Sequence, residues 1–193
     1  MNHVAMSRQN TVSVLGYSVY AGNRDYFADG VKGVVATLNP HSYVIARRDV
    51  QFREALMEAD LLIPDGTGIQ LAARVLRGRR IEKIAGSDLH EVIIDTLGKR
   101  GGSCFYLGSS EETLRKIRER LAAEHPSLRV GTYSPSFREV FTEEENCAMI
   151  TAVNSFAPQA LFVGMTAPKQ EKWVHEHRDM LSAPLICPVG AVF

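Results

Sequence analysis

The second half of the sequence alternates short apolar runs with longer stretches in which apolar residues recur at helical spacing. The apolar runs are Ser103 to Leu107, Leu128 to Tyr133, Ala160 to Val163 and Leu185 to Val189. Strands buried on both faces read as continuous apolar runs, and strands joined through helices pair in parallel. The alternation therefore predicts an α/β fold with a parallel sheet flanked by helices.

Cap residues predict where some of the intervening helices begin. The spacing of a capping box occurs twice, at Ser109 with Glu112 and at Thr142 with Glu145. Apolar residues also repeat at helical spacing between Asp88 and Lys99, which predicts a further amphipathic helix.

The first half of the sequence is less regular and predicts a smaller α/β part. We expect strands at Thr11 to Tyr20, Val34 to Thr37 and Leu61 to Ile63, and helices at Arg24 to Val31, His41 to Ala59 with a break near Asp49, and Gly68 to Leu76. Because no long linker interrupts the chain, residues 1–193 are interpreted as one catalytic domain.

Composition excludes several classes of protein. The 22 Lys and Arg residues balance the 22 Asp and Glu residues, which argues against a nucleic-acid partner. No run of about 18 apolar residues occurs, and the beginning of the chain lacks the layout of a secretory signal. The three cysteines lack metal-binding spacing, so we expect buried, reduced thiols in a cytoplasmic protein.

Three loops after expected strands gather small and polar residues, at 37–40, 64–68 and 164–171. Such loops meet at the carboxyl edge of a parallel sheet, where ligands bind. The candidate binding residues there are Thr37, Asn39, Gly66, Gly68, Gly164, Lys169, Gln170 and Glu171.

Asp65 has two readings. It is either the N-cap of the following helix or a general base that removes the proton of a sugar hydroxyl. In the second reading, Gly66 and Gly68 let a bulky ligand approach the backbone. Thr37 and Asn39 either contact that ligand or satisfy the backbone of a turn.

Gly108 precedes a helix start that could favour a phosphate, although neither the dinucleotide glycine pattern nor the Walker lysine is present. No Asp-x-Asp occurs, and His175 and His177 point in different directions on a helix. We therefore expect no metal and no cofactor. The arginines at 47, 48, 77, 79 and 80 are either solvated charges or contacts to a lipid pyrophosphate.

An ordered set of motifs resembles the WecG/TagA/CpsF glycosyltransferases over residues 11 to 193. The set comprises Thr37-x-Asn39-Pro40, Ala46 and Asp49, Ala59-Asp60, Pro64-Asp65-Gly66-x-Gly68, Gly86-Ser87-Asp88-Leu89, Gly131-x-Tyr133-Ser134-Pro135, Val163-Gly164, Pro168-Lys169-Gln170-Glu171-Lys172-Trp173 and Val189-Gly190-Ala191-Val192-Phe193. Pro-Asp-Gly-x-Gly together with Pro-Lys-Gln-Glu is the most specific part.

The resemblance implies a Rossmann-like sheet and an inverting, metal-independent glycosyltransferase. Its donor would be a UDP-linked N-acetylhexosamine, and its acceptor a polyprenyl-diphosphate-linked sugar of cell-surface polysaccharide synthesis. The resemblance also implies that Asp65 is the catalytic base and that Thr37 and Gln170 lie near the substrate. Asn39 is added because it lies close to Thr37 in the sequence.

Two departures from the family pattern bear on these expectations. Lys83 stands where the family carries an arginine, and a lysine cannot fork onto a phosphate. Family members also continue beyond Phe193 into a basic segment, so we expect a C-terminally truncated domain. With that segment the protein would lie at the inner face of the cytoplasmic membrane, and without it an exposed apolar surface would favour a homo-oligomer.

Two rival functions remain open on the sequence. One is a nucleotide-cofactor oxidoreductase, disfavoured because the dinucleotide glycine pattern is missing. The other is a non-catalytic protein that binds sugar nucleotides.

Overall fold

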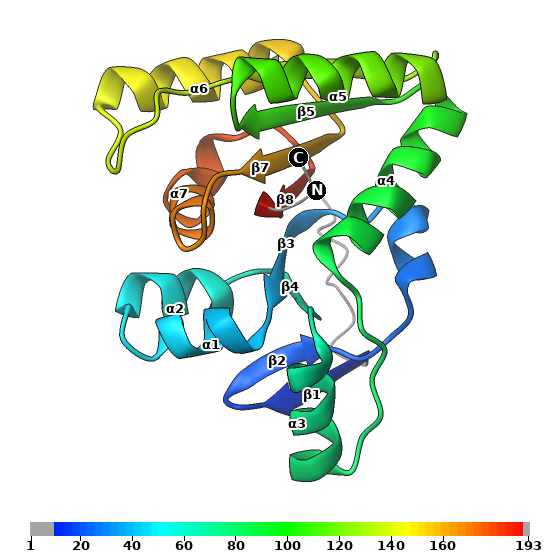
Figure 1. Ribbon diagram of the computed structural model, residues 1–193, viewed down its shortest axis with the longest axis vertical. Coiled ribbons are helices and arrows are strands. Elements are labelled where there is room, and N and C mark those ends of the chain that lie inside the picture. The colour runs from blue at the N-terminus through cyan, green and yellow to red at the C-terminus, as the bar shows by residue number, and fades with distance from the viewer. Residues whose placement is uncertain (1–9, 191–193) are drawn as a thin grey trace.

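The computed structural model describes residues 10–190 and contains a six-stranded parallel sheet (Figure 1). The strand order is β4-β3-β8-β7-β5-β6. The strands are β3 Gly33–Leu38, β4 Leu61–Pro64, β5 Ser103–Gly108, β6 Arg129–Tyr133, β7 Ala160–Gly164 and β8 Leu185–Pro188. The parallel sheet expected from the sequence is therefore confirmed, while residues 191–193 of the last motif lie outside the described residues.

Helices flank this sheet. They are α1 Pro40–Ala46, α2 Val50–Met57, α3 Thr67–Arg77, α4 Gly86–Arg100, α5 Glu111–Glu124, α6 Glu143–Phe156 and α7 Lys169–His177, with 3-10 helices η2 Arg24–Asp29 and η3 Arg178–Met180. Successive residues of a strand point to opposite faces, so Tyr106 of β5 packs in the cluster that contains α4 and α5 residues. Its neighbour Leu107 packs with residues of α6 and α7. This two-sided burial explains why the strands read as continuous apolar runs.

The N-terminal part is a hairpin and not the single strand expected at Thr11 to Tyr20. The two antiparallel strands are β1 Thr11–Val14 and β2 Tyr17–Tyr20. Leu15 and Gly16 connect them with φ values of 52° and 88°, as two-residue hairpin turns require. The run was read as one strand because the turn interrupts the apolar pattern only with Gly16. The hairpin packs with α1, α2 and α3 in a separate cluster of apolar residues.

One predicted helix cap is confirmed and one is wrong. Thr142 and Glu145 form the expected capping box at the start of α6. At α5 the cap is Ser110, whose hydroxyl accepts a hydrogen bond from the Thr113 amide at 3.2 Å. Ser109 has a φ of 63°, outside the extended conformation typical of an N-cap, and belongs to the loop before the helix.

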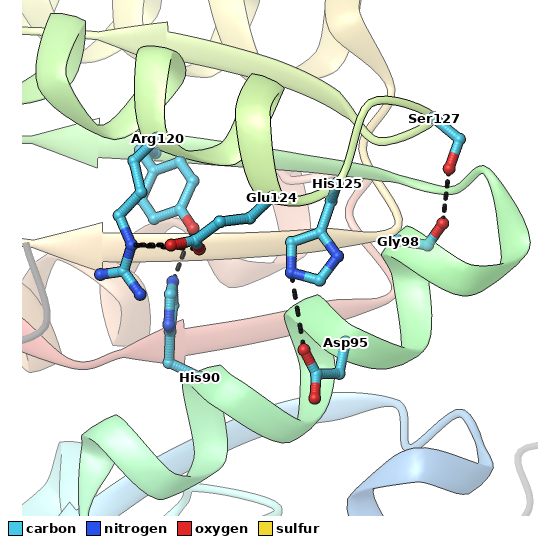
Figure 2. Close-up of polar contacts among 8 residues, drawn as sticks. His90, Asp95, Gly98, Arg120, Glu124, His125 and Ser127 are labelled. Carbon is cyan, nitrogen blue, oxygen red and sulfur yellow. Dashed lines mark hydrogen bonds and ion pairs between the residues drawn. The ribbon is translucent and has the colours of Figure 1, made fainter.

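Polar contacts join α4 to the residues that follow α5 and to the sheet (Figure 2). His90 Nε2 lies 2.6 Å from the Tyr106 hydroxyl, and His125 Nε2 lies 3.5 Å from Asp95 Oδ1. The Ser127 hydroxyl donates to the Gly98 carbonyl at 2.6 Å. These contacts fix α4 against one side of the sheet, and the first residues of α4 thereby hold their place at its carboxyl edge.

The cysteine prediction is correct for two residues and wrong for the third. Cys104 and Cys187 are buried free thiols in central strands, where burial raises the thiol pKa of both, that of Cys104 to about 12. Cys147 is exposed on α6 because its helical position faces away from the sheet.

Candidate active site

A cavity of about 960 Å³ opens at the carboxyl edge of the parallel sheet. Residues at the ends of all six strands, or in the loops after them, line its wall, from Asn39 after β3 to Gly190 after β8. Ligand sites in such sheets form at this edge, and the volume suits a ligand of nucleotide-sugar size. Eight residues singled out from the sequence line the cavity: Thr37, Asn39, Asp65, Gly108, Gly164, Lys169, Gln170 and Glu171.

Asp65 stands half-buried in the cavity wall directly after β4. Its backbone amide donates to the Leu38 carbonyl at 2.9 Å, which ties the Asp65 loop to the end of β3. The N-cap of α3 is Gly66, and no side-chain cap hydrogen bond occurs there. The interpretation of Asp65 as a helix N-cap is therefore wrong, and its carboxylate remains available to a ligand in the cavity.

The surroundings of Asp65 raise the pKa of its carboxyl above the ordinary value. Burial is the main cause, and the positive charge of Lys83 and a hydrogen bond from the Asn39 side chain act in the opposite direction. The negative charge of Asp88 adds to the increase. A carboxylate with a raised pKa accepts a proton more readily from a substrate hydroxyl.

Asn39 has a double role in this corner of the cavity. Its Oδ1 accepts a hydrogen bond from the Ser42 amide at 2.8 Å and so caps α1. The Nδ2 amide is then the group that can donate to Asp65. The turn reading of Asn39 is thus correct, and it coexists with a place beside the candidate base.

Gly66 and Gly68 do not line the cavity. A Cβ at Gly68 would lie 2.5 Å from Pro40 Cγ, and one at Gly66 would lie 3.6 Å from Pro40 Cδ. Gly68 is therefore needed so that α3 can pack closely against the start of α1. Gly66 has a φ of 100°, which an L side chain rarely adopts.

Gly108 and Gly164 lie side by side where β5 and β7 end. A Cβ at Gly108 would lie 2.2 Å from the Gly164 carbonyl oxygen, and Gly108 has a φ of 122°. The Ser109 amide donates to that same carbonyl at 3.1 Å. Both glycines allow two loops to meet at the floor of the cavity.

Gln170 and Glu171 form a buried pair in the cavity wall. Gln170 Oε1 accepts from the Met165 amide at 3.2 Å, and its Nε2 donates to Glu171 Oε1 at 2.9 Å. Within residues 10–190, Glu171 Oε2 has no hydrogen-bond partner, and burial raises the pKa of Glu171 to about 7. Gln170 thus holds the loop after β7 in place.

Lys169 points to a loop at 135–141 that the sequence reasoning missed. Its ammonium donates to the Arg138 carbonyl and lies 3.5 Å from the centre of the Phe141 ring. Most of this loop lines the cavity. The sequence pattern could have predicted its position, because the loop follows β6 and the loops after parallel strands gather at the carboxyl edge of the sheet.

Within residues 10–190, no three His, Cys, Asp or Glu side chains gather in a metal-ligand arrangement. His177 Nδ1 lies 2.8 Å from the Trp173 carbonyl, while His175 Nδ1 lies 3.8 Å from Glu58, so the two histidines have separate partners. In the same part of the chain, none of the helices has the length and apolar character needed to cross a bilayer.

Comparison with known proteins gives a consistent match. The sequence model of the glycosyl transferase WecG/TagA/CpsF family matches residues 12–193. Three relatives carry the name N-acetylglucosaminyldiphosphoundecaprenol N-acetyl-beta-D-mannosaminyltransferase. They come from Bacillus subtilis strain 168, Bacillus spizizenii strain W23 and Staphylococcus aureus strain NCTC 8325.

The relatives are distant and longer than this chain. The B. subtilis protein is 20% identical over 193 residues, which is all of this chain and 72% of the relative. The B. spizizenii protein is 24% identical over 86% of this chain and 63% of its own length. The S. aureus protein is 24% identical over 81% of this chain and 59% of its own length.

Proposed function

This chain belongs to the glycosyl transferase WecG/TagA/CpsF family, and on that premise we propose that it transfers an N-acetylhexosamine from UDP to a polyprenyl-diphosphate-linked sugar. The names of the relatives support this acceptor class, since each describes transfer to an undecaprenol-diphosphate-linked N-acetylglucosamine. The product would enter cell-surface polysaccharide synthesis, and the reaction would take place at the inner face of the cytoplasmic membrane.

The observation that carries the proposal is the half-buried Asp65 carboxylate in the wall of the cavity at the carboxyl edge of the sheet. In the reaction, an acceptor hydroxyl oxygen attacks the anomeric carbon of the donor. Asp65 takes the hydroxyl proton, and the bond from the anomeric carbon to the diphosphate oxygen breaks, so that UDP leaves with the electron pair. A single displacement inverts the anomeric configuration.

Several helix starts surround the same cavity and support binding of a diphosphate. Gly86 and Ser87 at the start of α4, Ser109 before α5 and Lys169 at the start of α7 all line it. The Ser109 and Lys169 amides already donate to the Gly164 and Thr166 carbonyls, so at these two positions it is the helix dipole that favours an anion, while first-turn amides also do so at α4. We propose that these groups stabilise the leaving UDP without a metal ion, in the role that a cation has elsewhere.

Replacement of Asp65 tests the proposal. The Asp65→Asn variant should stay folded and lose at least about 100-fold in kcat/KM, the range of general-base effects, because an amide cannot take the hydroxyl proton. The assay would present a panel of nucleotide sugars with a short-lipid acceptor and resolve products by mass. Asp179→Asn, at an exposed carboxylate of η3, is the matched control and should leave turnover unchanged.

Two results would contradict the proposal. Near wild-type turnover of the Asp65→Asn variant would exclude Asp65 as the base. Loss of turnover on treatment with EDTA, restored by a divalent cation, would exclude the metal-independent form of the reaction.

A further inference from the structure

The outer face of α3 exposes large apolar side chains to solvent. Leu71, Val75 and Leu76 are 62%, 71% and 53% exposed. The inner face of the same helix is already satisfied, because Ile69 and Ala73 are buried in the cluster with the N-terminal hairpin. The outer apolar side chains are therefore not needed for packing within the described residues.

Four arginines surround these apolar residues. Arg74, Arg77, Arg79 and Arg80 are all exposed, and no Asp or Glu occurs between Gly66 and Ile81. None of the ion pairs found within residues 10–190 includes any of the four. Among the described residues, Arg77 alone of the four has a hydrogen-bond partner, since its Nε donates to the Ser13 carbonyl at 2.8 Å. In a chain with no net charge, this is a local excess of positive charge.

We propose that the outer side of α3 and the segment after it dock on an anionic lipid surface. Leu71, Arg74 and Val75 lie on one face of the helix, Leu76 and Arg77 lie in its last turn, and Arg79 and Arg80 follow its C-cap. An apolar strip bordered by arginines is the pattern of helices that lie in the membrane interface, with apolar side chains in the acyl region and cations at the phosphates.

Charge favours a lipid surface over a second copy of the chain. Two copies that paired through this face in a symmetric dimer would bring two sets of four arginines together. Like charges placed against each other in an interface are costly, whereas lipid phosphates would neutralise the same arginines.

The position of α3 also suits an enzyme that takes a lipid-linked acceptor, and this step alone rests on the proposed function. The helix begins two residues after Asp65 and has 11 residues, so it is about 16 Å long. Figure 1 shows α3 and the hairpin at one end of the molecule, with α5 and α6 at the other. Docking through α3 would therefore bring the Asp65 loop near the headgroup layer, where an acceptor diphosphate would lie.

Vesicle flotation tests the inference with the protein itself. The protein should float with phosphatidylcholine vesicles that contain phosphatidylglycerol, and much less with phosphatidylcholine alone. Each arginine near an anionic surface contributes about fivefold to partitioning. The Arg74→Gln, Arg79→Gln, Arg80→Gln triple variant should therefore bind about 100-fold more weakly, and the Leu71→Ser, Val75→Ser double variant at least about tenfold more weakly.

Matched controls use residues outside α3. An Arg115→Gln, Lys116→Gln, Arg120→Gln variant of α5 carries the same change in charge, and Met180→Ser removes an equally exposed apolar side chain. Both should bind vesicles like the wild type. Calorimetry with UDP should give the same affinity for every variant, which separates failure of this inference from failure of the proposed function.

Three results would overturn the inference. The first is equal flotation with neutral and anionic vesicles, and the second is unchanged flotation of the α3 variants. The third is a stable dimer, seen by light scattering, that the Leu71→Ser, Val75→Ser variant converts to a monomer, because that result would assign the α3 face to self-association.

Discussion

Burial and the charge of Lys83 act in opposite directions on the pKa of the candidate base, Asp65. The pKa of Asp65 is raised chiefly by burial, and Lys83 is the first of the groups that lower it. The positive charge of Lys83 thus favours the ionised form of Asp65, which is the form that can act as a base.

Removal of the Lys83 charge should move the pH dependence of the reaction. Without the ammonium, the pKa of Asp65 rises further, so the acidic limb of the kcat/KM profile of Lys83→Met should shift to higher pH. Lys83→Arg keeps the positive charge and should keep the profile in place. An unshifted limb in Lys83→Met would mean that Lys83 does not act on Asp65, whatever its effect on the maximal rate.

The candidate base itself could be found from the sequence, but its neighbours could not. Pro64-Asp65-Gly66 ends a short apolar run, so its place at the carboxyl edge of the sheet follows from local pattern. The role of Gly68 was interpreted differently because its close contact, Pro40, lies 28 positions earlier in the chain, and no local pattern reveals it. The buried pair of Gln170 and Glu171 was likewise singled out only as residues near a ligand.

At the scale of elements, the ends of β5 and β7 approach each other more closely than side chains would allow. Gly108 combines a positive φ with contact to the Gly164 carbonyl, whereas Gly30 has a φ of 83° and open space around its Cα. An alanine at Gly108 would therefore meet both a positive φ and a steric clash, whereas an alanine at Gly30 would meet a positive φ alone.

Gly108→Ala should destabilise the protein more than Gly30→Ala does. The strained backbone costs on the order of 1–3 kcal/mol at either site, and a Cβ at Gly108 must in addition push two strands apart. Urea unfolding would measure the difference, and the Gly108 variant should also weaken UDP binding. Equal losses of stability in the two variants would contradict the steric argument.

The order and type of most elements could be predicted from local pattern, and the errors have local causes. The capping-box spacing predicts the N-cap of α6 correctly. At α5 it misplaces the N-cap by one residue, because two serines are adjacent there. The sheet order could not be predicted, since it depends on contacts between segments that are distant in sequence.

At the scale of the whole molecule, the partly buried His90 and the buried Glu171 change the free energy of unfolding with pH in opposite directions. Burial lowers the pKa of His90 to about 4 and raises that of Glu171 to about 7. The contribution of a neutral His90 is complete above its ordinary pKa of 6.5 and is lost as the pH falls toward 4. The contribution of a protonated Glu171 is complete below 4.5 and is lost as the pH rises through about 7.

Single variants should reveal these two opposed contributions. Each contribution to the free energy of unfolding reaches about 3 kcal/mol at its limiting pH. Their opposite pH dependences nearly cancel between pH 4.5 and 6.5 in the wild type. The free energy of unfolding of Glu171→Gln should therefore rise with pH across this range, and that of His90→Gln should fall. Chemical unfolding at several pH values measures both slopes, and slopes of the same sign in the two variants would contradict this account.

The position of β8 in the sheet determines when the sheet can be completed during synthesis of the chain. This last strand pairs with β3 on one side and β7 on the other, so it is the strand that joins the early half of the sheet to the late half. Asp65 belongs to the first half and Gly108 to the second. On the ribosome, the two walls of the cavity can reach their final register only after residues 185–188 have been synthesised. A chain without residues 185–188 would therefore lack the strand that holds these two walls in register.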